Sequence, residues 1–128
     1  NLNQQLDLSQ AWHVCKQASL VVTMDSGILH LAGTTDTHII LLGSSIHPQL
    51  RIPYRNGSQY YKMDYLPGTC RLFCGSNLKY SVREHGTLRG VPYIKECLEK
   101  KETFECHPDA ESVFQRIKER VHPKWLRT

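Results

Sequence analysis

The stretch from Leu20 to Ala32 most constrains how this chain can fold, because its character changes sharply in the middle. Its first four residues, Leu-Val-Val-Thr, are β-branched or aliphatic and are typical of a short buried strand. The polar run Asp25-Ser26-Gly27 then interrupts the pattern, and the apolar residues that follow recur at helical spacing. The stretch therefore predicts a strand, a tight turn and the start of a helix.

A turn of this kind presents unbonded backbone N–H groups at the carboxyl end of the strand. The N-terminus of the helix adds a partial positive charge, so an anion is the expected ligand. Gly27 lets a ligand approach the backbone closely, and Asp25 or Ser26 can cap the helix. His30 lies one turn further on and can face the same ligand. The alternative is an ordinary strand-to-helix turn, in which Asp25 and Ser26 only cap the helix.

Helix and strand patterns alternate through the first third of the chain. We expect helices over 6–18 and 27–34, and strands over 20–24 and 38–42. This order forms a repeating α/β unit, which implies parallel strands joined by right-handed crossovers. Cys15 lies on the apolar side of the first helix, so we interpret it as a small core residue.

The remaining elements are a strand and a final helix. Residues 59–66 alternate in polarity and predict a strand, which Pro67-Gly68 ends. Pro108 suits the first position of the final helix. We expect Phe114 and Ile117 to dock that helix onto the sheet, since they share its apolar face.

Four cysteines lie between these two elements in two pairs: Cys70 and Cys74, then Cys97 and Cys106. Two clusters joined by a loop can close a tetrahedral thiolate site for zinc or iron. The segment has few apolar residues, so a bound metal would supply order that burial cannot. Free or redox-paired thiols remain the alternative interpretation.

Composition limits the classes of partner that the chain can bind and the cell compartment in which we expect it. The net charge is +4 over 128 residues, but the basic residues are scattered and aromatic residues do not interleave with them, which disfavours nucleic-acid binding. The chain has five cysteines, an odd number, and begins with polar residues instead of an apolar leader, which favours a reducing compartment. No stretch approaches the roughly 18–20 apolar residues of a membrane span. We expect a cytoplasmic protein, or one at the inner face of the membrane.

The run from Asp25 to Ala32, together with the apolar strand 38–42 and the glycine that follows it, resembles a known motif. It is similar to the nucleotide-sugar motif of the heptosyltransferase-like glycosyltransferases, glycosyltransferase family 9, in which Asp-Ser-Gly-x-x-His-Leu-Ala lies in the C-terminal Rossmann-like domain of a two-domain GT-B enzyme. The resemblance is closest over residues 8–48. It implies an α/β fold, a Rossmann-like parallel sheet forming part of the C-terminal half of a GT-B fold, with the four-cysteine segment as an irregular metal-binding insertion.

The resemblance also implies a site. The donor would be an ADP-heptose-like nucleotide-sugar, and the acceptor a glycan, lipopolysaccharide or protein hydroxyl. The family's acceptor base lies on the N-terminal domain, which implies no catalytic residue here, no transfer by this chain alone, and that domain as a partner, with an oligomer left open. The substrate-binding residues implied are Asp25, Ser26, Gly27, His30, Gly43 and Ser44.

The sequence thus predicts three parts: a nucleotide-sugar-binding part over 1–66, a metal-binding segment over 67–107 and a C-terminal helical part over 108–128. The cysteine segment resembles the iron finger of the autotransporter heptosyltransferase branch in place and ligand count. An alternative function stays open at this point. The chain could be a metal-stabilised interaction module that keeps the Rossmann-like turn without catalysis.

Overall fold

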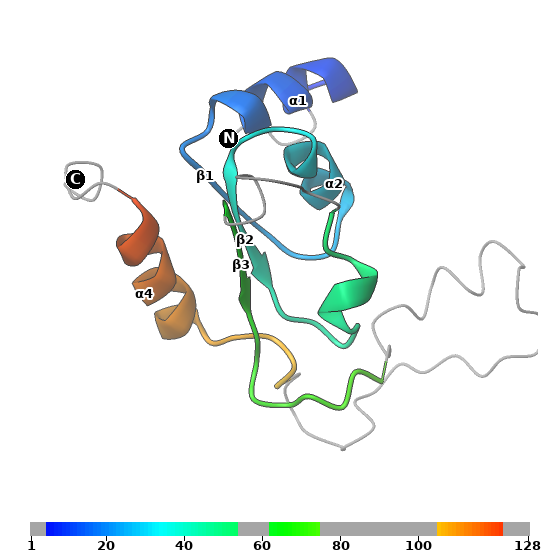
Figure 1. Cartoon of the computed structure of the whole chain (residues 1–128), viewed down its shortest axis with the longest axis vertical. Helices are drawn as coiled ribbons and strands as arrows, with labels where there is room; N and C mark the ends of the chain where they lie inside the picture. The colour runs from blue at the N-terminus through cyan, green and yellow to red at the C-terminus, as the bar shows by residue number, and fades with distance from the viewer. Residues whose placement is uncertain (1–4, 54–61, 75–104, 122–128) are drawn as a thin grey trace, which may run out of the picture.

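The computed structural model describes residues 5–53, 62–74 and 105–121 (Figure 1). Within these ranges the chain forms a parallel sheet of three strands in the order β1-β2-β3, flanked by helices. The elements in chain order are α1 (Leu8–Gln17), β1 (Leu20–Thr23), α2 (Gly27–Gly33), β2 (His38–Leu42), the 3₁₀ turn η1 (Pro48–Leu50), β3 (Met63–Leu66) and α4 (Ala110–Arg120). The predicted alternation of helices and parallel strands is confirmed.

The core forms around the central strand β2, which is covered on both faces. Ile39 and Leu41 point to the side of α1 and α2, and Ile40 points to the other side; all three are buried. Because both faces of β2 are buried, its sequence is a nearly continuous apolar run instead of an alternating one. Cys15 lies in the same core, where burial raises the pKa of its thiol, so the prediction of a core residue is confirmed.

Three threonines shape the connection between α2 and β2. The hydroxyl of Thr35 donates to the carbonyl oxygen of Ala32 at 2.7 Å, and that of Thr37 donates to the carbonyl oxygen of Cys15 at 2.7 Å. Thr34 makes the matching bond to the carbonyl oxygen of Leu31. The carbonyls of Leu31 and Ala32 also accept the backbone N–H groups of Thr34 and Thr35, so the threonine hydroxyls add to the hydrogen bonds that end α1 and α2 beside the sheet.

The final helix differs from the sequence-based expectation in two ways. Pro108 precedes the helix, and Asp109 is the N-cap, its side chain accepting a hydrogen bond from the backbone of Ser112. Phe114 is half exposed, with the Lys118 ammonium 4.7 Å from its ring centroid. The prediction that Phe114 docks the helix is therefore wrong. Figure 1 shows α4 on the opposite side of the sheet from α2.

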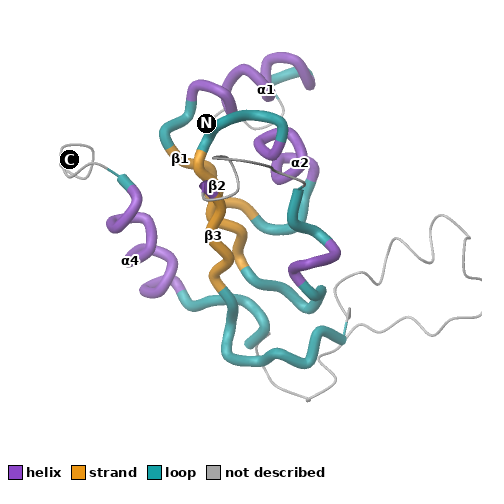
Figure 2. The backbone as a smooth tube through the Cα atoms, viewed as in Figure 1, coloured by secondary structure: helices purple, strands orange, loops and turns teal. Residues whose placement is uncertain are grey.

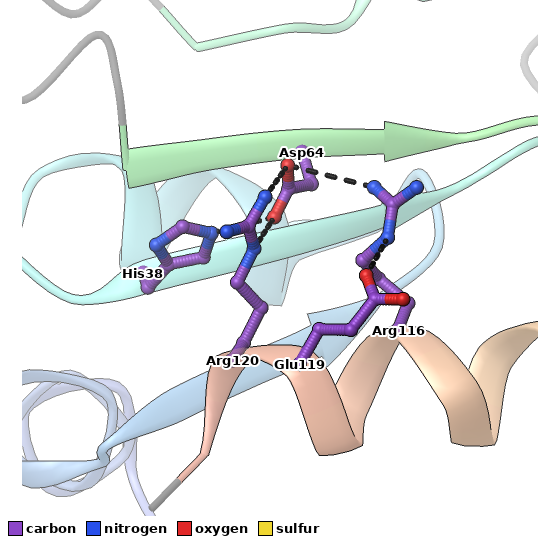
Figure 3. Close-up of polar contacts among 5 residues, drawn as sticks. All are labelled: His38, Asp64, Arg116, Glu119 and Arg120. Carbon is purple, nitrogen blue, oxygen red and sulfur yellow. Dashed lines mark hydrogen bonds and ion pairs between the residues drawn. The ribbon is translucent and has the colours of Figure 1, made fainter.

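Polar contacts to Asp64 on β3 link α4 to the sheet (Figure 3). Arg120 donates from Nε and Nη2 to the two carboxylate oxygens at 2.6 and 2.8 Å, and Arg116 lies at 3.5 Å. His38 of β2 contacts the same carboxylate at 2.8 Å. Across the described part of the chain, no helix is long and apolar enough to cross a bilayer.

Candidate functional site

The carboxyl ends of three parallel strands meet at one edge of the sheet, where open α/β folds bind their ligands. The Asp25-Ser26-Gly27 turn follows β1, Gly43 follows β2, and Pro67 follows β3. Figure 2 shows the loops after β2 and β3 leaving the sheet at this same end. Thr23 pairs with Leu41 in the parallel register, so continuing the two chains brings Asp25 level with Gly43. The structure thus brings the predicted site residues to one edge.

The side chains of the turn after β1 do not cap α2 as expected. Ser26 occupies the N-cap position, but its side chain makes no capping bond and lies 3.1 Å from the hydroxyl of Thr23. The Asp25 carboxylate instead accepts a hydrogen bond from Nε of Arg51, at 2.7 Å. Arg51 is a residue that sequence reasoning missed. No pattern signals it, because it lies 26 residues further along the chain.

The remaining turn residues face solvent. A Cβ atom added to Gly27 would meet nothing within 4 Å, so the space above this backbone is open. His30 is exposed one turn further on. With only seven residues, α2 has a small dipole, so attraction for an anion would come mainly from individual N–H groups at the turn.

The residues after β2 are buried, unlike those after β1. Gly43 donates its N–H to the carbonyl oxygen of Leu66 at 2.7 Å. A Cβ atom at Gly43 would lie 2.9 Å from the Cα atom of Pro67 and 3.0 Å from the carbonyl oxygen of Cys106. The Ser44 hydroxyl accepts from the backbone of Ile46 at 3.2 Å, within a side chain only 6% exposed. Ser44 would therefore reach a ligand through its backbone.

The structure describes three of the four cysteines of the predicted metal site, Cys70, Cys74 and Cys106. In residues 5–53, 62–74 and 105–121, no group of three or more histidine, cysteine or acidic residues could hold a metal ion. Cys97 lies outside the described residues, so the four-cysteine set stays a prediction. The structure does bring the chain near Cys70 and Cys106 together, since the Cys70 N–H donates to the carbonyl oxygen of Glu105 at 3.0 Å.

Two cavities lie at opposite edges of the sheet. One of about 410 Å³ adjoins the carboxyl end of β3 and is walled by polar groups of Thr69, Arg71 and His107 together with the first residues of α4. A larger one of about 630 Å³ lies at the amino edge, between Trp12, Lys16 and the threonine-rich turn. The predicted site therefore lies beside the smaller cavity and away from the larger one, with the turn after β1 open to solvent and with Gly43 and Ser44 buried.

Comparison with known proteins decides the family. The family model for glycosyltransferase family 9 (heptosyltransferase) matches residues 1–71, which include the Asp25–Gly27 turn and all three strands. The chain belongs to glycosyltransferase family 9. No curated protein and no solved structure matches the chain. Membership in family 9 makes the chain part of the glycosyltransferases, which implies a nucleotide-sugar donor and an acceptor. The match ends next to Cys70, and the cysteine-finger branch stays a prediction.

Proposed function

We propose that this chain forms the donor-binding part of a glycosyltransferase. The enzyme moves a sugar, which we propose is heptose, from a nucleotide-sugar to a hydroxyl of a glycan, lipopolysaccharide or protein. The observation that carries the proposal is the family match over a turn that follows β1 and remains open above Gly27. The alternative, a metal-stabilised interaction module without donor binding, is an outcome of the test below.

Each turn residue has a defined role in the proposal. Backbone N–H groups at Gly27 bind the diphosphate, since charge-assisted hydrogen bonds to phosphate do not depend on the identity of a side chain. The exposed His30 contacts the same group from the next turn of α2. Asp25 is fixed by Arg51, which leaves its second carboxylate oxygen able to accept from a sugar hydroxyl. Arg51 also places a positive charge beside the diphosphate.

The test introduces a bulky side chain at Gly27, where it would clash with a bound ligand but with no atom of the protein. We expect Gly27→Phe to weaken ADP-heptose binding at least about tenfold, because one charge-assisted hydrogen bond corresponds to roughly 1.5–3 kcal/mol. The fold should persist, since no protein atom lies within 4 Å of the added Cβ. Isothermal titration calorimetry measures the affinity, and circular dichroism checks the fold.

The matched control is Ser9→Phe, which adds the same bulk to an exposed position on α1, away from the edge. It should leave the affinity unchanged. Equal affinities of the wild type and Gly27→Phe for ADP-heptose would overturn the assignment of the turn. A wild-type chain that binds neither ADP-heptose nor ADP would instead support the non-catalytic interaction module.

A further inference from the structure

Two chain segments lie side by side at the carboxyl edge of the sheet, and we call them the neck: residues 67–70 and 105–107. The N–H of Cys70 donates to the carbonyl oxygen of Glu105 at 3.0 Å, and the hydroxyl of Thr69 reaches the same oxygen at 3.5 Å. Gly68 packs so closely that a Cβ atom there would overlap the carbonyl oxygen of Glu105. The neck therefore joins the two ends of the cysteine segment.

The neck holds the end of β2 through His107. Nδ1 of His107 lies 2.8 Å from the carbonyl oxygen of Gly43. Because a carbonyl oxygen can only accept a hydrogen bond, Nδ1 carries the ring proton and donates it. The N–H of Gly43 donates to Leu66 at the end of β3. Both polar groups of the Gly43 backbone thus point toward β3 and the neck, and the packing around Gly43 leaves little room for them to rotate.

This arrangement fixes the next peptide group. A trans peptide is planar, with its C=O and N–H pointing in opposite directions. Because the carbonyl of Gly43 points toward the neck, the N–H of Ser44 points the other way, toward the side of β2 where β1 lies. The register places the Asp25 turn at the same level. The Ser44 N–H is therefore aimed at the side of the edge that holds the turn after β1.

We propose that His107 is a positioning residue that orients the Ser44 N–H as a hydrogen-bond donor to the diphosphate of the nucleotide-sugar. This inference rests on the proposed function and deepens it, since it adds a donor from β2 to those of the turn after β1. It also means that the neck of the cysteine segment sets the geometry of the donor site, although none of its residues touches the donor.

The experiment compares His107→Ala with His107→Asn, because the asparagine amide can replace Nδ1 as a donor to the Gly43 carbonyl. With ADP and with pyrophosphate as probes, we expect His107→Ala to weaken binding by about tenfold, the fold-change for loss of one hydrogen bond to a charged group. His107→Asn should restore most of the affinity. His13→Ala, on exposed α1, is the control and should bind as the wild type does.

A purely structural role predicts different results, which an NMR titration separates. In the wild type, the Ser44 amide resonance should move strongly when pyrophosphate is added, and this response should be lost in His107→Ala while the Gly27 response remains. Wild-type affinity in a folded His107→Ala variant, or a Ser44 amide that does not respond in the wild type, would overturn the inference. Failure of the wild type to bind either probe would instead overturn the proposed function.

Discussion

Asp64 illustrates how one residue can decide the placement of an element. Its carboxylate is 15% exposed and accepts from Arg120 and His38. Burial by itself would raise the pKa of Asp64, but hydrogen bonds from Arg120 and His38, with the charge of Arg120, hold that pKa below its usual value. The ionised carboxylate is therefore the form that the folded protein stabilises.

We expect Asp64→Asn to lower the free energy of unfolding by about 1–2 kcal/mol at pH 7, a range that allows for the solvent exposure of Arg120. Since the pKa of Asp64 is lower in the folded protein, its contribution is fully present above the unfolded value near 4 and is lost as pH falls through the folded value. The difference between wild type and variant should thus shrink below about pH 4.

Urea unfolding at a series of pH values measures this difference. Glu119→Gln is the matched control: Glu119 belongs to the same cluster and lies 3.2 Å from Arg116, but its side chain is half exposed. That variant should change stability by less than about 0.5 kcal/mol. A pH-independent difference for Asp64→Asn would contradict the role assigned to the charge.

Single residues were predicted from sequence only where the signal is local. The turn at Asp25, Ser26 and Gly27 was found because strand, turn and helix patterns are contiguous there. Arg51 and His107 were missed as partners of the edge, since each contacts it across 26 or 64 residues of chain and neither lies in a motif. Their roles come from packing, which residue spacing does not encode.

At the scale of elements, periodicity predicted where helices and strands occur but not how α4 is attached. The apolar face of α4 suggested hydrophobic docking through Phe114, whereas ion pairs from Arg116 and Arg120 to Asp64 link α4 to β3. An ion-pair cluster produces no periodic pattern of residues in the sequence. The same limit applies to the cysteine segment, whose pairwise spacing indicates a metal without defining the path of the chain.

We propose that Cys70, Cys74, Cys97 and Cys106 bind one zinc or iron ion. The neck supports this, because it brings the chain at Cys70 beside the chain next to Cys106. Elemental analysis should find one metal per chain, reduced in Cys74→Ser but unchanged in Cys15→Ser, since Cys15 is buried in the core. A visible charge-transfer band would indicate iron, because zinc has a filled d shell.

A chelator provides a second measurement for the metal proposal. We expect metal binding to be coupled to the folding of residues 68–107. Removal of the metal should therefore unfold that segment and leave the sheet folded. Amide exchange should then rise near Cys70 and stay unchanged at Ile39 and Ile40. A metal-free wild type purified under reducing conditions, or a disulfide within either cysteine pair, would defeat the proposal.

At the scale of the whole molecule, the α/β class and the order of the elements could be predicted because β1 and β2 are apolar runs, β3 alternates in polarity, and turn residues follow each strand. The strand order and register match the parallel unit that the alternation implies. How the carboxyl edge of the sheet is assembled could not be predicted from the pattern alone. That edge is built from Asp25, Gly43 and Pro67, which lie far apart in sequence and meet only because the strands are parallel.

By itself, this part of the fold is expected to bind a donor but not to transfer the sugar. The family resemblance places the acceptor base of a family 9 enzyme on the N-terminal domain, so we expect the 128 residues here to bind the donor without supplying the group that deprotonates the acceptor. Holding donor, acceptor and base together contributes roughly 7–11 kcal/mol to lowering the barrier in favourable cases, and one half of a cleft loses that contribution. We therefore expect the purified chain to bind ADP-heptose without transferring heptose. Mass spectrometry of a lipopolysaccharide-core acceptor after incubation checks this, with an intact two-domain family 9 enzyme as positive control. Product from the isolated chain at the rate of that control would contradict the prediction that transfer requires both domains.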